Sequence, residues 1–189
     1  MVIFSITIVT SLIYRSTLSS ELLWWDDNKY VFENEQIKSL SFDNISTMFS
    51  TFTLGDYNPL VSLSFAIDYS LYGLHKVSPI AYSGDGYHLT SLIIHLLSVI
   101  ILFFLCMKLS RSQLVSAVVA TLFAIHPMNV ESVAWVTERK DQLYVLFYLG
   151  AMLTYLTYLE KGAKKKYLLL TGFFFLLSLF SKAMAVTLP

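Results

Sequence analysis

The feature that most constrains this chain is a predominantly apolar run from Tyr87 to Leu109, in which Lys108 is the one charged residue. A transmembrane helix needs ~20 consecutive apolar residues, so this run is long enough to cross a bilayer. The composition agrees, because 56% of the residues are hydrophobic and 14% are charged, whereas soluble domains carry about 25% charged residues. The sequence therefore predicts an integral membrane protein.

Four more apolar segments predict an all-α, multi-pass fold with about five transmembrane helices. Residues 1–19 form the first expected helix, and residues 88–189 hold helices two to five, with the later apolar segments at 113–125, 142–159 and 167–188. Small side chains recur every four residues at Ser116, Ala120 and Ala124, a spacing that lets membrane helices approach closely. The sequence ends on an apolar segment, which predicts a chain truncated at its C-terminus.

Residues 20–87 are predicted to form a long loop outside the membrane. The loop is too rich in aromatic and aliphatic residues for a disordered linker. Ser41–Ile45 resembles a helix start, and Leu60–Leu71 has the apolar spacing of a helix that lies at the membrane interface. Ser78–Gly86, which contains Pro79, is predicted to be a turn.

Basic residues in the short connections predict the orientation. Lys108 and Arg111 flank one connection and four lysines occupy residues 161–166, so both connections are expected on the cytoplasmic side. If each apolar segment crosses once, the acidic pair Asp26-Asp27 and the polar segment 126–141 share the opposite, non-cytoplasmic side. The two most polar stretches of the chain are therefore expected to meet there.

The acidic pair follows Trp24 and Trp25 directly after the first apolar segment. Tryptophan favours the membrane–water interface, so Asp26 and Asp27 are expected just outside the hydrocarbon, where they can stay ionised. A catalytic carboxylate and a solvated pair that begins a loop are both open readings of these residues.

Three other groups of polar residues could carry function. The segment 126–141 contains Arg139, which suits two-pronged phosphate binding, although an ion-pair cluster explains the segment equally well. Lys182 is expected in the outer part of the last span, where a charge indicates function unless it snorkels to the surface. His88, Ser91, His95 and Ser98 share one helix face that should point into the bundle, with His95 in an interhelical hydrogen bond.

Several classes of protein are disfavoured. The formal net charge is zero, and no basic patch with interleaved aromatic residues predicts a nucleic-acid partner. The four histidines and the single cysteine, Cys106, show no ligand spacing, so no metal site is predicted. The N-terminus lacks a cleavable-signal pattern.

The motifs, taken in order, resemble the N-terminal membrane part of the tetratricopeptide-repeat-containing glycosyltransferases of the GT-C superfamily. These enzymes are similar to transmembrane O-mannosyltransferases and, more distantly, to protein O-mannosyltransferases. The residues that carry the resemblance are Trp25–Asn34, Tyr57–Leu60, Tyr87–Leu89, His126-Pro127, Val130–Trp135, Glu138–Asp141 and Ser181–Pro189. Asn58 departs from the family pattern, which commonly has arginine there.

The resemblance implies an enzyme that transfers a sugar, mannose in the related enzymes, from a polyprenyl-phosphate carrier to a hydroxyl group of a protein or glycan. Asp26, favoured over Asp27, would be the general base, and Arg139 and Lys182 would stabilise the departing lipid phosphate. The other expected substrate-binding residues are His126, Glu131, Asp141, Tyr57 and His88. A divalent cation is left open as a cofactor. The short N-terminus favours a bacterial inner membrane over the endoplasmic reticulum.

Two other classes of function stay open on the sequence. A transporter would also place His95 and Lys182 inside a helical bundle, but it predicts an internal repeat of helices that the sequence does not show. A non-catalytic membrane scaffold would tolerate neutralisation of Asp26 and Asp27, whereas an enzyme would not.

Overall fold

The computed structural model describes residues 1–78 and 81–188, and these residues are predominantly helical. Pro79, in the predicted turn, and Pro189, which ends the last motif, lie outside the described residues. The described part departs from an all-α fold in a short antiparallel pair formed by β1 (Lys76–Ser78) and β2 (Ala81–Tyr82) and in two isolated β-bridges, Glu21–Ser83 and Thr53–Asp56.

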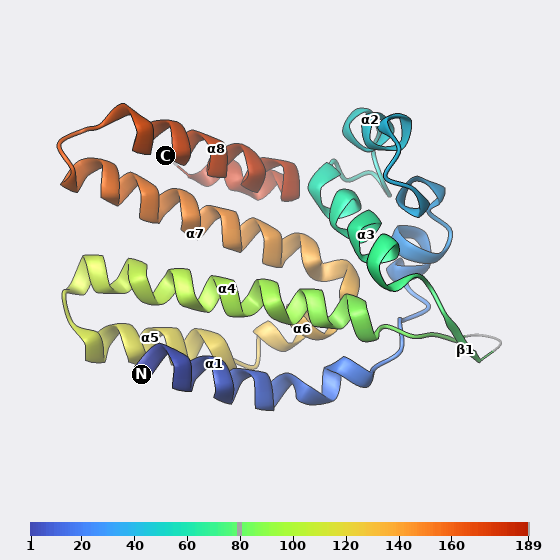
Figure 1. Cartoon of the computed structure of the whole chain (residues 1–189), viewed down its shortest axis with the longest axis horizontal. Coiled ribbons are helices and arrows are strands. Elements are labelled where there is room, and N and C mark those ends of the chain that lie inside the picture. Colours follow the sequence, from blue (N-terminus) through green and yellow to red (C-terminus); the bar gives the residue numbers. More distant parts are fainter. Residues whose placement is uncertain (79–80, 189) are drawn as a thin grey trace.

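Five helices lie side by side and form a bundle (Figure 1). Their directions alternate along the chain, so each helix runs opposite to the one before it in the bundle. They are α1 (Val2–Ile13, extended by a 3-10 segment over Tyr14–Ser19), α4 (Asp85–Ser110), α5 (Gln113–Ile125), α7 (Arg139–Glu160) and α8 (Lys165–Ser181).

Three segments of the described chain are long and apolar enough to cross a membrane: Val2–Ser19, Asp85–Ser110 and Val136–Glu160. Helix α5 has 13 residues and α8 has 17, which at 1.5 Å per residue gives ~20 Å and ~26 Å against a hydrocarbon core of ~30 Å. Helix α5 is short because His126-Pro127 ends it, as the sequence predicts. The structure therefore shows three candidate spans rather than five.

The last helix ends earlier than predicted. Helix α8 stops at Ser181, and Lys182 is extended, with φ −157° and ψ 134°. A 3-10 turn, Ala183–Thr187, follows, and the chain turns back along α8 (Figure 1). Lys182 thus lies at the end of a helix rather than inside a continuous span: its backbone N–H donates to the Ser178 carbonyl at 3.0 Å, and its extended dihedral angles end α8 there.

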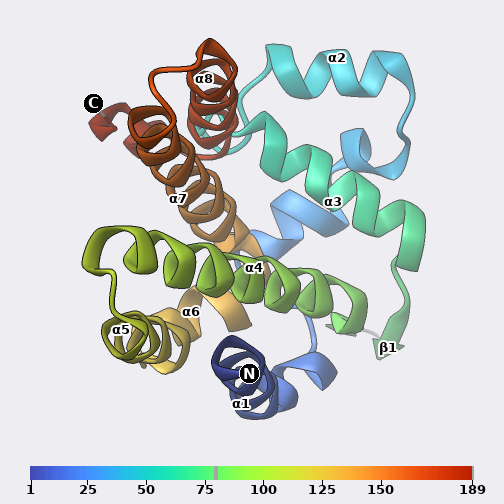
Figure 2. The same cartoon turned by 60° about the vertical axis from the view of Figure 1, so that its left-hand side comes forward.

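The connection between α1 and α4 folds against one end of the bundle. It contains a single π-helical turn (Asn28–Phe32), a 3-10 turn (Glu35–Lys38), α2 (Phe42–Ser50) and α3 (Pro59–Tyr72). The predicted helix start is confirmed, since the Ser41 hydroxyl accepts a hydrogen bond from the backbone N–H of Asn44. Figure 2 shows α2 and α3 beside the bundle, with α4 between the α1/α5/α6 side and the α7/α8 side (α6 is Asn129–Ala134).

The small-residue stripe on α5 faces the bundle, as predicted. Ser116, Ala120 and Ala124 are all fully buried, and the two alanines pack in one apolar cluster with Val99 and Phe103 of α4. His95 of α4 forms the expected interhelical hydrogen bond, because its Nε2 lies 3.0 Å from the carbonyl oxygen of Ala124. Helices α4 and α5 therefore pack with their backbones close together.

The two basic connections lie at the same end of the bundle, opposite α2 and α3 (Figure 1). An ion pair between Lys108, near the end of α4, and Glu160, at the end of α7, ties this end together.

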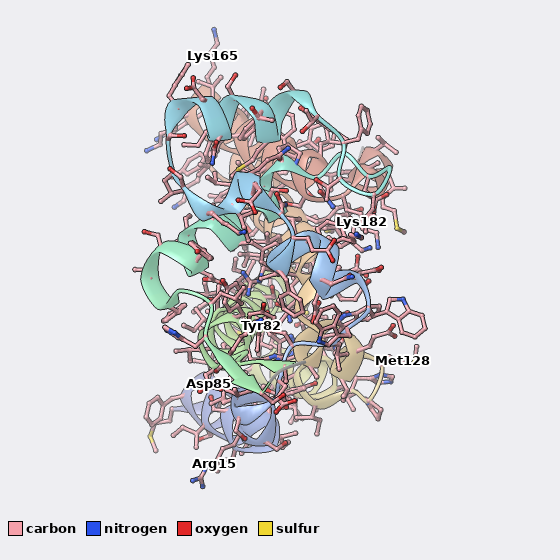
Figure 3. All side chains as sticks on the ribbon, turned by 90° about the vertical axis from the view of Figure 1, so that its right-hand side faces the viewer. Arg15, Tyr82, Asp85, Met128, Lys165 and Lys182 are labelled. Carbon is pink, nitrogen blue, oxygen red and sulfur yellow. The ribbon has the colours of Figure 1, made fainter. Side chains whose placement is uncertain are left out.

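Arg15 lies beyond α1, is exposed and points away from the protein (Figure 3). An outward-pointing arginine can reach polar surroundings, so its position avoids the cost of a buried charge.

Candidate functional site

Asp27 joins the first polar stretch to the second. Its side chain is buried, and one carboxylate oxygen accepts hydrogen bonds from the backbone N–H of Thr137, at 3.1 Å, and from the Thr137 hydroxyl. The other oxygen accepts from the backbone N–H of Leu23 at 2.9 Å. The expectation that these stretches meet is thus confirmed, and three donors hold Asp27 in place.

Asp26 is held differently from its neighbour. It is half-buried, and within residues 1–78 and 81–188 no hydrogen bond or ion pair occupies its carboxylate. It acts electrostatically on the Tyr30 hydroxyl, as do Asp56 and Lys140. Burial raises the pKa of Tyr30, and the two carboxylates add to the rise whereas Lys140 opposes it. Asp26 is therefore a half-buried carboxylate whose charge acts on the Tyr30 hydroxyl and whose oxygen atoms have no partner among the described residues.

Arg139 forms a fully buried ion pair with Asp68 of α3. The guanidinium also donates to the Tyr87 carbonyl at 2.7 Å and stacks over the Phe65 ring at 4.6 Å. The second Asp68 oxygen accepts from the Thr90 hydroxyl at 2.7 Å. Burial raises the pKa of Asp68, and the charge of Arg139 opposes that rise. Arg139 thus fastens α7 to α3 and α4 and is enclosed by protein, so its expected contact with phosphate is not provided by this arrangement.

The next two residues of α7 point to a different set of partners. Asp141 forms an ion pair with Lys182, and both side chains are about one-third exposed. Lys140 lies 3.4 Å from a Glu138 oxygen and 3.7 Å from an Asp56 oxygen. Successive residues at the start of α7 therefore have different environments. Arg139 forms a buried ion pair, whereas Lys140 and Asp141 belong to a partly exposed charged cluster.

Two cavities meet at Lys182. One, of about 220 Å³, is lined by polar residues of α4, α6 and α7 that include His95, Asn129 and Asp141. The other, which we call the α3–α8 cavity, has about 600 Å³ and lies between the start of α3 and the end of α8. Lys182 and Met184 line both cavities. In Figure 3 Lys182 and Met128 lie along the same side of this end of the molecule.

The other residues expected to bind substrate are spread over this end of the molecule. Tyr57 lines the α3–α8 cavity and donates its hydroxyl hydrogen to the Phe49 carbonyl at 2.9 Å. His126 and Glu131 are exposed outside both cavities. His88 is buried, and neither ring nitrogen has a hydrogen-bond partner in the described part of the chain, although the Glu21 backbone lies close.

Sequence reasoning missed three residues that shape this region, Asp68, Thr137 and Asp56, and named Lys140 only within the charged motif Glu138–Asp141. Asp68 lies in an apolar helix, where a lone carboxylate is a signal for a buried cation partner. Thr137 and Asp56 carry no such signal, because their roles depend on segments distant in the sequence. Among the described residues, no group of three or more histidine, cysteine or acidic side chains is arranged to hold a metal ion.

Comparison with known proteins identifies relatives over part of the chain. No family model matches it, and no solved structure matches it. It is 34% identical to protein O-mannosyl-transferase TMTC1 of Mus musculus over 127 residues, which are 66% of this chain and 13% of the relative. It is 34% identical to TMTC3 of Homo sapiens over 99 residues, 52% of this chain and 10% of the relative. With Tmtc2 of Drosophila melanogaster the identity is 30% over 160 residues, 78% of this chain and 16% of the relative.

These relatives are animal proteins, so the preference for a bacterial inner membrane is not supported and is corrected. That preference rested on the short N-terminus, which does not distinguish a bacterial inner membrane from a eukaryotic membrane. The chain spans less than a fifth of the length of the relatives named here. The chain has three candidate membrane spans of its own. Over the part that is covered, it belongs to the TMTC family of protein O-mannosyl-transferases, as its motifs predict.

Proposed function

We propose that this chain is an N-terminal portion of the membrane-embedded part of a glycosyltransferase that moves mannose from a polyprenyl-phosphate carrier to a hydroxyl group of a protein. The observation that carries the proposal is a half-buried carboxylate, Asp26, that has no partner among the described residues and lies next to Asp27, which is hydrogen-bonded to Thr137 just before α7, in a homologue of O-mannosyl-transferases. The mannose donor and the protein acceptor come from the names of the relatives.

The chemistry assigns one step to each group. Asp26 accepts the proton of the acceptor hydroxyl as its oxygen attacks the anomeric carbon. The bond from that carbon to the carrier phosphate breaks, the polyprenyl phosphate leaves with the bonding electrons, and the configuration at carbon inverts. Lys182 stabilises the charge that develops on the phosphate. Asp27 positions Asp26, because its three hydrogen bonds hold the segment on which Asp26 lies.

We further propose that all five bundle helices cross the membrane, with α2 and α3 on the non-cytoplasmic side. The alternating helix directions support this, as does the grouping of the basic connections at the opposite end (Figure 1). The short helices α5 and α8 can be accommodated by local thinning of the bilayer at a modest cost per ångström. The animal relatives support an internal eukaryotic membrane, the endoplasmic reticulum, with the site facing its lumen.

A transfer assay tests the proposal on the longest open reading frame that contains this chain. We expect the purified protein in nanodiscs to transfer radiolabelled mannose from polyprenyl-phosphate mannose to a threonine-containing peptide. Lys182→Met should lower the rate by ~10²-fold or more, whereas Lys161→Met, in the exposed basic connection, should not. Absence of transfer with every polyprenyl-phosphate sugar, from folded protein, would contradict the proposal.

A further inference from the structure

The end of the bundle opposite α2 and α3 carries a strong excess of positive charge (Figure 1). The whole chain has 13 basic and 13 acidic residues, yet residues 108–112 and 160–166 hold six basic side chains and one carboxylate. That carboxylate, Glu160, pairs with Lys108. The other five basic side chains are exposed and form no ion pair within residues 1–78 and 81–188. We call the six the basic cluster: Lys108, Arg111, Lys161, Lys164, Lys165 and Lys166.

The stability of α8 does not explain the lysines at its start. A helix N-terminus carries a partial positive charge, so acidic side chains stabilise it and basic side chains do not. The first turn of α8 contains no acidic residue, and Lys164, at the N-cap position, makes no capping hydrogen bond. The charge of residues 164–166 therefore works against the helix that they begin, and an anion from outside the protein would relieve that repulsion.

The connection that presents these lysines has a defined shape. The backbone N–H of Ala163 donates to the Tyr158 carbonyl at 3.0 Å. Gly162 and Ala163 both have positive φ, 69° and 57°, and such an angle is uncommon for alanine. In Figure 3 the side chain of Lys165 extends away from the protein. The lysines thus project outward from a tight turn whose backbone is held by α7.

An apolar groove, which we call the α4–α7–α8 groove, opens beside the basic cluster. Its volume is about 150 Å³, less than the ~300–1,000 Å³ of pockets that enclose whole small molecules, so it fits a segment of a longer ligand. On α7 its wall follows Tyr148, Met152 and Tyr155, whose spacing places them on one helix face. Leu109 of α4 and Thr171 of α8 line the other sides. The groove therefore follows the axis of α7, the direction that an acyl chain takes in a bilayer.

The groove and the basic cluster are close enough to contact one lipid molecule. Leu109 of the groove follows Lys108 directly in α4. Tyr155 of the groove lies five residues before Glu160, which at 1.5 Å per residue is ~8 Å along α7. The rings of Tyr155 and Tyr158 stack with centroids 6.1 Å apart, and tyrosine favours the level of the lipid headgroups. The basic cluster thus lies on the water side of these rings and the groove on the hydrocarbon side.

We infer that this end of the protein binds an anionic glycerophospholipid, with one acyl chain in the α4–α7–α8 groove and the headgroup phosphate at the basic cluster. Basic pockets between membrane helices bind anionic headgroups in this way. Membrane topology accounts for lysines in a connection but not for an apolar groove beside them, and a free phosphate ion would use the lysines without the groove. Among the described residues, the groove shares no lining residue with the two cavities that meet at Lys182. The lipid site is therefore separate from the proposed transfer chemistry.

Native mass spectrometry of the detergent-purified protein tests the inference, using the longest open reading frame that contains this chain. Bound lipid is counted during titration with dioleoyl phosphatidylserine or dioleoyl phosphatidylcholine, which have the same acyl chains. A triple variant removes half of the basic cluster: Lys164→Gln, Lys165→Gln and Lys166→Gln. The matched control removes three lysines from the connection between α1 and α4, at the other end of the bundle: Lys29→Gln, Lys38→Gln and Lys76→Gln.

A second pair of variants tests the groove. Met152→Trp adds bulk to the wall of the groove. Leu169→Trp introduces the same side chain at an exposed position of α8 that does not line the groove. Circular dichroism and the melting temperature check that each variant is folded. Inorganic phosphate and polyprenyl phosphate are added as competitors, the first for a site that binds any phosphate and the second for a site that belongs to the sugar carrier.

We expect one phosphatidylserine to bind saturably, about tenfold or more tighter than phosphatidylcholine. We expect its affinity to fall about tenfold or more in the triple variant at 164–166, to fall in Met152→Trp, and to stay unchanged in both controls. Equal affinity for the two lipids, equal affinity in the two triple variants, wild-type binding by Met152→Trp, or displacement by either competitor would overturn the inference. The readout needs no turnover, so its failure is distinguishable from failure of the transfer assay.

Discussion

Two ion pairs made by the first turn of α7 differ in almost every physical respect. Arg139 and Asp68 are enclosed by protein, and further hydrogen bonds from Arg139 and Thr90 satisfy the pair. Two residues later, Asp141 pairs with Lys182 at the boundary of two cavities, about one-third exposed. The buried pair joins three helices and can do no chemistry with a substrate it does not reach. The half-exposed pair holds little together and can exchange its partners for a ligand. Burial, rather than charge or position in a motif, separates the ion pair that joins helices from the ion pair that a ligand could reach.

The largest effect should follow removal of one partner of the buried pair. Asp68→Asn leaves the Arg139 guanidinium buried without its counter-charge, and we expect a loss of ~3–5 kcal/mol in the free energy of unfolding. Thermal unfolding of the nanodisc-embedded protein measures it. The double variant Asp68→Leu with Arg139→Met removes both charges and should recover most of that loss. A double variant as unstable as Asp68→Asn would show that the pair itself stabilises the protein.

A smaller effect is expected at the joint between the two polar stretches. Thr137→Val removes the hydroxyl that donates to Asp27 and keeps the backbone donor, so stability should fall by ~1–2 kcal/mol. Thr47→Val is the control, since the Thr47 hydroxyl donates to a backbone carbonyl of its own helix, α2, and is exposed. Equal losses in the two variants would argue against a special role for the Asp27–Thr137 contact.

The half-exposed pair should contribute least among the charged contacts. Lys182→Met is expected to lower the free energy of unfolding by less than ~1 kcal/mol, because solvent screens the pair and a partly exposed ion pair is worth little. The same unfolding measurement checks this. A loss similar to that of Asp68→Asn would remove the distinction between the two pairs.

The smallest effect concerns the bundle interior. His95→Leu removes the hydrogen bond to the Ala124 carbonyl, and interhelical hydrogen bonds in membranes average ~0.6 kcal/mol. We expect a fall in the melting temperature just large enough to resolve, with α4 and α5 still packed through Ala120 and Ala124. Disulfide formation between cysteine pairs engineered into α4 and α5 would check this packing. If His95→Leu changed which pairs form a disulfide, the helices would have separated, and that result would contradict the expectation.

The helices of the bundle could be predicted because their signals are local. Residue Pro127 and the apolar run before it define α5, and the polar face of α4 from His88 to Ser98 is buried as its spacing indicates. The end of α8 could not be predicted, since Ala183–Leu188 is as apolar as the helix before it and Lys182, where the helix ends, pairs with Asp141, 41 positions away in the sequence.

The candidate site was predictable only as a region. The sequence indicated that Asp26-Asp27 meets residues 126–141, but adjacent motif residues have opposite environments in the fold. Asp27 is buried and Asp26 is not, and Arg139 is enclosed while Lys140 faces a cavity. The position of Asp27 depends on Thr137, 110 positions away in the sequence, and that of Arg139 depends on Asp68 of α3, 71 positions away. No local pattern carries that information.

The most direct test of the account compares Asp26→Asn with Asp27→Asn, measuring mannose transfer and melting temperature on the same preparations. If Asp26 is the base, Asp26→Asn lowers transfer by ~10²–10⁴-fold with the melting temperature unchanged. Asp27→Asn should instead lower the melting temperature, because an amide cannot accept all three hydrogen bonds that hold this segment. Wild-type transfer by a folded Asp26→Asn protein would contradict the assignment of Asp26 as the base.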